Sequence, residues 1–154
     1  MATLVDVENG MVDKFLADAD VAAKIGRRFY KVACREWILT LEDFVQERSP
    51  RTGMWADYRR AGVTLNRLKG GLESRLRFAS FEIRCYGQVM ENAEALLEDF
   101  IDVIGASFAG TWGNQTSVTI KNAHWDYSQM ASDYDETFKQ AWASCVLMVP
   151  YLAS

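Results

Sequence analysis

The spacing of apolar residues along the chain predicts helices in three places. Residues 4–17 carry apolar side chains at near-helical spacing. A short helix at 19–25 follows, with Asp18 or Asp20 as its N-cap. The clearest pattern covers residues 89–108, where apolar positions recur every 3.6 residues. They form one stripe that should pack on a sheet: Val89, Ala93, Leu96, Leu97, Phe100, Ile101 and Ile104.

Alternating apolar and polar positions predict about five or six strands. The earlier strands are expected at residues 27–33, 63–69, 74–86 and 116–127. The alternation changes phase near Phe78 and Ala79, so we expect a bulge or bend there. The closing segment 138–152 is apolar on both faces, as a central strand would be. Two principal helices packed on a mainly antiparallel sheet make an α+β fold.

Two segments have little periodicity. Residues 128–137 are rich in turn formers, and residues 48–62 predict a long loop or hairpin arm. The second segment interleaves cations with aromatic rings, a mixture found at protein-binding hot spots and in single-strand nucleic-acid binders. A pI near 5.0 argues against nucleic acid. We predict a partner-docking loop anchored by Trp55, with a plain surface loop as the alternative. Its docking residues are Arg48, Arg51, Trp55, Tyr58, Arg59 and Arg60.

Length and composition predict a single globular domain, 1–154. The chain has 154 residues, of which 49% are hydrophobic and 25% charged. No apolar run approaches the roughly 18 residues that cross a bilayer, and the opening residues are acidic where a signal peptide is basic. We therefore expect a soluble protein that does not enter membranes. Cys34, Cys85 and Cys145 have no CxxC spacing and are interpreted as reduced thiols.

The net charge of −4 is distributed unevenly along the chain. Residues 24–84 hold fourteen basic and seven acidic residues, whereas residues 85–154 hold two basic and nine acidic ones. One interpretation is that these charges interleave on the folded surface. The other is a basic face and an acidic face that suit head-to-tail association of identical subunits. The helix at 89–108 supplies a candidate subunit interface, its acidic outer face of Glu91, Glu94, Glu98, Asp99 and Asp102.

Motifs for catalysis or cofactor binding are scarce. His124 is the sole histidine, and Asp126 shares its strand face, which is half of a metal site at most. The sequence has no GxSxG elbow and no phosphate-binding glycine loop. We expect no enzyme, no metal and no cofactor. A small ligand-binding or enzymatic domain is the alternative from a different class, and it rests on His124 and Asp126 alone.

Three runs of sequence resemble the tail terminator, or tail completion, family of tailed phages. FLADADVAAKIGRRFYKV at 15–32 resembles the opening helix, turn and first strand of that family. FASFEIRCYGQVMENAEALLEDFIDVI at 78–104 is similar to a strand that runs straight into a helix rich in Ala, Glu and Leu. VTIKNAHWDYSQMASDYDETFKQAWASCVLMV at 118–149 is similar to the final hairpin with its acidic turn. The chain departs from the family between Cys34 and Glu73.

The resemblance implies a structural protein of the virion. Such subunits form a homo-hexameric ring that caps the tail tube and joins it to the head. The implied partners are the tail tube protein, a neck or connector protein, and genomic DNA that passes through the pore without sequence-specific binding. The implied location is the tail or neck of the virion, after assembly in the host cytoplasm. A head-completion or stopper connector protein is the alternative within the phage class.

Overall fold

The computed structural model describes residues 3–32, 54–67, 73–106, 109–112, 118–136 and 139–152. These residues form three helices and seven strands. The helices are α1 (Leu4–Ala17), α2 (Ala19–Ile25) and α5 (Met90–Gly105). The strands are β1 (Phe29–Lys31), β2 (Trp55–Arg67), β3 (Glu73–Gly87), β4 (Ala109–Trp112), β5 (Val118–Lys121), β6 (His124–Asp135) and β7 (Gln140–Leu152).

Five strands form one mixed sheet in the order β1-β2-β3-β7-β6. Strand β1 runs parallel to β2, and each of the other pairs is antiparallel. Strands β4 and β5 form a separate antiparallel pair. The α+β class and the central place of β7 are confirmed, since β7 lies between β3 and β6. The strand predicted at 27–33 is β1, and the structure shows that it runs parallel to β2 at the edge of an otherwise antiparallel sheet.

The ends of α1 and α2 follow from local capping. The Thr3 side chain accepts from the backbone N–H of Asp6, and the Asp6 carboxylate accepts from the backbone N–H of Thr3, which makes a capping box. Asp18 caps α2 by accepting from the backbone N–H groups of Asp20 and Val21. Gly26 ends α2 at a φ of 58°, a backbone conformation that favours glycine. Both helices begin and end where the sequence predicts.

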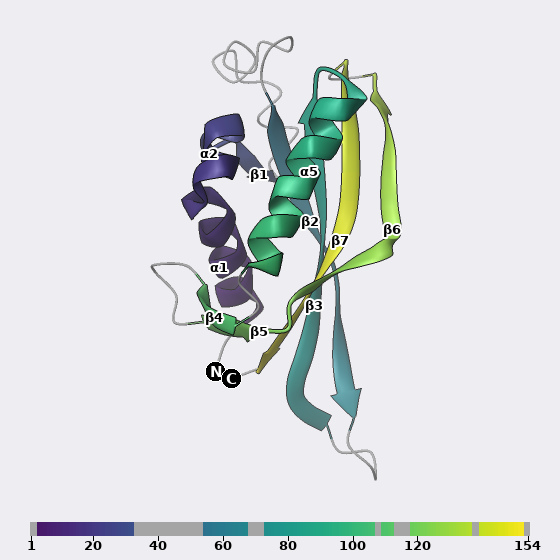
Figure 1. Cartoon of the computed structure of the whole chain (residues 1–154). Helices are drawn as coiled ribbons and strands as arrows, with labels where there is room; N and C mark the ends of the chain where they lie inside the picture. The colour runs from purple at the N-terminus through teal and green to yellow at the C-terminus, as the bar shows by residue number, and fades with distance from the viewer. Residues whose placement is uncertain are drawn as a thin grey trace.

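The three helices cover one face of the sheet (Figure 1). Helix α5 packs on β3 and β7, and α2 lies beside both α5 and β2. The Phe100 ring of α5 lies 4.3 Å from the Phe15 ring of α1 and 5.4 Å from the Phe29 ring of β1, measured between centroids. These edge-to-face contacts join the helix layer to the sheet edge.

The apolar stripe of α5 is largely as predicted. Ala93, Leu96, Leu97, Phe100 and Ile104 are buried, and Val103 joins them. Val89 is the N-cap of the helix and is 49% exposed, so its predicted place in the stripe is wrong. Ile101 is only partly buried, at the margin of the core.

The loop predicted at 48–62 is corrected by the structure. Residues 48–53 lie outside the described residues, but from Trp55 onward the chain is strand β2, paired with β3 over its length. The sequence of β2 shows no clear alternation of apolar and polar residues, because polar residues on both faces of the strand have partners inside the protein. An antiparallel extension does project beyond the helices, formed by the far ends of β2 and β3 (Figure 1).

The bulge predicted near Phe78 and Ala79 is wrong. The pairing of β3 with β7 is continuous through Phe78 and Ala79. The register instead shifts in β2 between Arg60 and Gly62, where one extra residue enters the ladder. Gly62 adopts a φ of 152° there, which is rare for other residues. The alternation within β3 is unbroken: Ala79, Phe81, Ile83 and Cys85 are buried on one face, and Leu76 and Phe78 are partly buried on the other.

Two other boundaries also differ from the prediction. Residues 128–135, expected as turns, continue β6, and pairing with β7 holds the part from Ala131 to Asp135 extended. Residues 109–112, where the sequence pattern predicts no strand, form β4 through pairing with β5. Strand pairing between distant segments overrides the local turn preference in both places.

Candidate functional site

The aromatic and basic residues of the predicted docking loop lie within β2. Trp55 is 1% exposed, and its indole N–H donates to the Oε1 of buried Gln140 at 2.6 Å. Tyr58 is also buried, and Arg59 is 60% exposed at its side chain. Trp55 is therefore not the exposed anchor that the loop interpretation requires. Arg48 and Arg51 lie outside the described residues.

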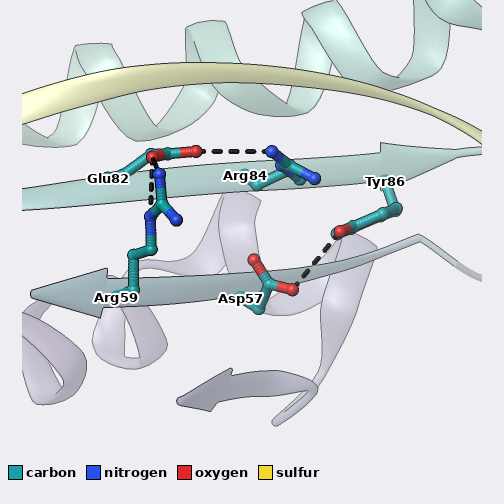
Figure 2. A network of polar contacts seen from close by, with 5 residues as sticks. All are labelled: Asp57, Arg59, Glu82, Arg84 and Tyr86. Atoms are coloured by element: carbon teal, nitrogen blue, oxygen red, sulfur yellow. Dashed lines mark hydrogen bonds and ion pairs between the residues drawn. The ribbon is translucent and has the colours of Figure 1, made fainter. Parts of the chain in front are cut away.

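Arg59 and Arg60, the cations of this segment that the structure describes, are engaged inside the subunit. On the sheet face away from the helices, Arg59 donates to the Oε2 of Glu82 through Nε at 2.8 Å. Arg84 donates to the other oxygen of Glu82 at 3.4 Å (Figure 2). The guanidinium of Arg84 lies 3.8 Å above the Trp142 ring, a cation–π contact.

The buried Asp57 completes this polar ladder. It accepts a hydrogen bond from the Tyr86 hydroxyl at 3.4 Å (Figure 2). Burial opposes the positive charge of Arg84, but Tyr86, Asp57 and Glu82 together outweigh burial and raise its pKa. Arg84 therefore stays charged. The ladder of β2 and β3 side chains holds the register of the two strands by charge pairing.

A second charged cluster is built around the buried Glu8 of α1. Its carboxylate is paired with the Lys31 ammonium at 2.9 Å, with the Arg60 guanidinium, and with the Tyr58 hydroxyl at 3.0 Å. Burial alone would raise the pKa of Glu8, but the hydrogen bonds from Lys31, Arg60 and Tyr58 outweigh it and lower the pKa. This cluster ties α1 to the first two strands of the sheet.

Sequence reasoning missed Glu8 as a site residue. It lies four residues after Leu4 and three before Met11, within the apolar stripe of its own helix. A carboxylate inside an apolar stripe signals a buried polar contact, because an isolated buried charge is strongly disfavoured. Its cationic partners come from β1 and β2, so the sequence alone could not name them.

The acidic face of α5 is divided in two. Asp99 is half-buried and forms an ion pair with Lys24 of α2, so it belongs to the fold of the subunit. The other four acids, Glu91, Glu94, Glu98 and Asp102, are exposed. None of these four has an ion pair within the part of the chain that the structure describes.

His124 and Asp126 do not form a metal or catalytic pair in the described residues. His124 is exposed, and its Nδ1 lies 2.9 Å from the carbonyl oxygen of Asn122. The Asp126 carboxylate accepts from Ser128 and Gln129, and these hydrogen bonds lower its pKa. Asp126 thereby organises the irregular part of β6. Among the described residues, no group of three or more His, Cys, Asp or Glu side chains could hold a metal ion.

The cysteines within the described residues are free and buried. Burial raises the pKa of Cys85 well above its ordinary range and also raises that of Cys145. Cys34 lies outside the described residues. The described helices include none that is long and apolar enough to cross a membrane.

Comparison with known proteins finds similarity in structure and not in sequence. No protein-family model matches the chain, and no curated protein matches it. A solved structure described as the virion of a native gene transfer agent (GTA) particle contains a chain with the same fold. The two chains are 13% identical and superpose with a TM-score of 0.60, over 93% of this chain and 92% of the other. At this identity the match establishes the shared fold.

Proposed function

We propose that this chain is a structural protein of a tailed-phage-like virion. The observation that carries the proposal is the fold shared with a GTA virion chain over nearly the full length of both proteins. The match covers 93% of this chain and 92% of the other chain, so the shared fold is not confined to one small motif. The role is architectural, and we expect neither catalysis nor a bound cofactor.

Within the virion, the proposed role is that of a tail terminator. The support is the sequence resemblance to that family, which falls on the body of the fold: α2 and β1, then β3 and α5, then β5 to β7. The segment between Cys34 and Glu73, where the sequence departs from that family, includes β2. Copies would form a ring on top of the tail tube and prevent further tube rings from adding. The opposite surface of the ring would bind the neck protein, and DNA would pass through the pore.

The size of the subunit is compatible with this role. A compact domain of this length has a radius of gyration of about 15 Å and a diameter of about 40 Å. Six touching copies would surround a hole of about 40 Å. Duplex DNA would fit through this hole, since the depths of its major and minor grooves add up to roughly 16 Å. A single copy could not surround DNA, so the pore requires a ring.

Disruption of the gene in the genome that encodes the chain tests the proposal. A terminator halts tube growth, so its loss should give filled heads beside unattached tails of uncontrolled length in electron micrographs. Supplying the protein from a plasmid should restore tails of uniform length joined to heads. Tails of normal length beside heads that leak DNA would instead identify a head-completion or stopper protein. Infectious particles of normal shape would contradict a structural role.

A further inference from the structure

Strand β6 presents apolar side chains at an open edge of the sheet. It is the last strand in the sheet order, so one side of its backbone has no neighbouring strand among the described residues. Tyr127, Met130 and Tyr134 are 61%, 51% and 48% exposed, and they account for three of the seven large exposed hydrophobic residues in the described chain. Exposed apolar groups gathered on one edge indicate an interaction surface.

Tyr127 and Met130 lie in an irregular part of β6, whereas Tyr134 lies in the paired part, opposite Ala141. Asp126 pairs with Val146 and Ala131 with Ser144, so four residues of β6 lie opposite a single residue of β7. The Asp126 carboxylate holds this segment by accepting from the backbone N–H of Ser128 at 3.1 Å and from the Gln129 amide at 2.7 Å. Such bulges redirect side chains away from the ladder and are common at edges.

Beside this edge lies a groove between α5 and β6, which we call the acidic groove. It has a volume of about 310 Å³ and is lined by Glu94, Leu97, Glu98, Met130, Ala131, Ser132 and Ala143. Glu94 and Glu98 are one helical turn apart, so their like charges repel each other on the same side of α5. An apolar floor flanked by two carboxylates suits the methylene stem and guanidinium of an arginine.

The opposite edge of the sheet carries the complementary charge. We call it the basic edge, and it consists of Lys24 at the end of α2, Arg27 and Arg28 in the connection that follows, and Lys31 of β1. The topology places β1 and β6 at the two ends of the sheet (Figure 1). These four cations thus lie at the edge of the sheet opposite the acidic groove.

Arg27 is the cation of the basic edge that is available to a partner. It is exposed, and no ion pair with an acid of the described chain engages it. Lys24 and Lys31 pair with Asp99 and Glu8 within the subunit. Arg28 donates to the backbone carbonyl oxygens of Met54 and Lys24, which fixes the turn that presents Arg27.

We propose that the acidic groove of one copy binds the basic edge of a second copy, with Arg27 entering between Glu94 and Glu98. The inference rests on the proposed function, because it identifies the lateral contact of the proposed ring. Binding through two different surfaces on opposite edges is heterologous, and it closes into a ring when the rotation per subunit permits. Tyr127, Met130 and Tyr134 supply the apolar part of the contact.

Charge reversal tests the contact. One variant carries Glu94→Lys and Glu98→Lys, and a second carries Arg27→Glu. Each should remain folded by circular dichroism and thermal unfolding, yet need a concentration at least about tenfold higher than the wild type to assemble. Assembly is followed by size-exclusion chromatography with light scattering, alone and in the presence of tail tubes. A mixture of the two variants should restore assembly, because each altered surface meets its complement.

The restored assemblies have a further diagnostic property. The two variants must alternate around the ring, so rings formed by the mixture contain equal numbers of each, which native mass spectrometry measures. A matched control, Glu91→Lys with Asp102→Lys, changes the charge of α5 by the same amount outside the groove. This control should assemble like the wild type.

The outcomes separate this inference from the function it rests on. If wild-type rings form and the charge reversals leave them unchanged, the lateral contact lies elsewhere and the terminator proposal stands. Loss of assembly in the control, or absence of rescue by the folded mixture, would also overturn the groove. If the wild type forms no ring either alone or in the presence of tail tubes, the proposed ring and the proposed contact through the acidic groove are both wrong.

Discussion

Trp55 stacks on Tyr86 with the ring centroids 3.9 Å apart and the ring planes at 2° to each other. The two residues are paired directly across β2 and β3, and both are buried on the sheet face away from the helices. A segment with the composition of an exposed binding loop thus contributes one of the best-packed pairs in the protein. The stack also fixes the register in which Asp57 and Arg59 meet their partners.

Trp55→Ala should lower the free energy of unfolding by about 3–5 kcal/mol, because it removes a large buried ring and leaves Gln140 without its indole donor. Urea unfolding followed by circular dichroism measures the change. The control is Tyr127→Ala on the exposed part of β6, which should change stability by no more than about 0.5 kcal/mol. A Trp55→Ala protein as stable as this control would contradict the buried stack.

Gly87→Ala should destabilise the protein by about 1–3 kcal/mol through overpacking. A Cβ at Gly87 would lie 2.8 Å from the backbone nitrogen of Ala93 and 2.8 Å from the Cβ of Asn92, where β3 passes close to the first turn of α5. Thermal unfolding compares it with Gly105→Ala, whose Cβ would have no atom within 4 Å. The Gly105 variant should be as stable as the wild type or more stable by up to about 1 kcal/mol. Equal effects at the two positions would refute the close approach.

Glu8→Gln should cost about 2 kcal/mol at neutral pH, because it removes the charge that Lys31 and Arg60 share. The pKa of Glu8 is lowered from its ordinary value of 4.5, so its stabilisation is fully present above pH 4.5 and is lost as the pH falls through the lower folded pKa. The difference between wild type and Glu8→Gln should therefore shrink below pH 4.5 in urea titrations at several pH values. The exposed Glu94→Gln is the control and should show little difference at any of these pH values. A constant difference down to the lowest pH would show that Glu8 is not engaged as a carboxylate.

Ring assembly should weaken with added salt if the acidic groove and the basic edge meet. The Debye length falls from about 10 Å at 0.1 M to about 3 Å at 1 M ionic strength, so attraction between partly exposed charges is screened. Light scattering at constant protein concentration measures the assembled fraction. Assembly that is unchanged or stronger at high salt would indicate a mainly apolar contact through Tyr127, Met130 and Tyr134.

The helices could be predicted from the sequence because their determinants are local. The carboxylate of Asp18 and the backbone freedom of Gly26 act within a few residues, and the 3.6-residue period of α5 comes from one continuous segment. The interior place of β7 in the sheet could also be predicted, because its segment is apolar on both faces and most of its residues are buried. The same 3.6-residue period predicts that the acidic residues lie on the outer face of α5.

The tertiary structure decided the sheet order and the use of the charged residues. Trp55 lies in a strand because β3 pairs with it, and Glu8 is buried because cations reach it from β1 and β2. The sequence contains the charge asymmetry, but only the order β1-β2-β3-β7-β6 places Arg27 at the edge of the sheet opposite the acidic groove. Helix signals act over one or two turns, whereas strand pairing and ion pairs join residues far apart in the chain, so no local pattern encodes them.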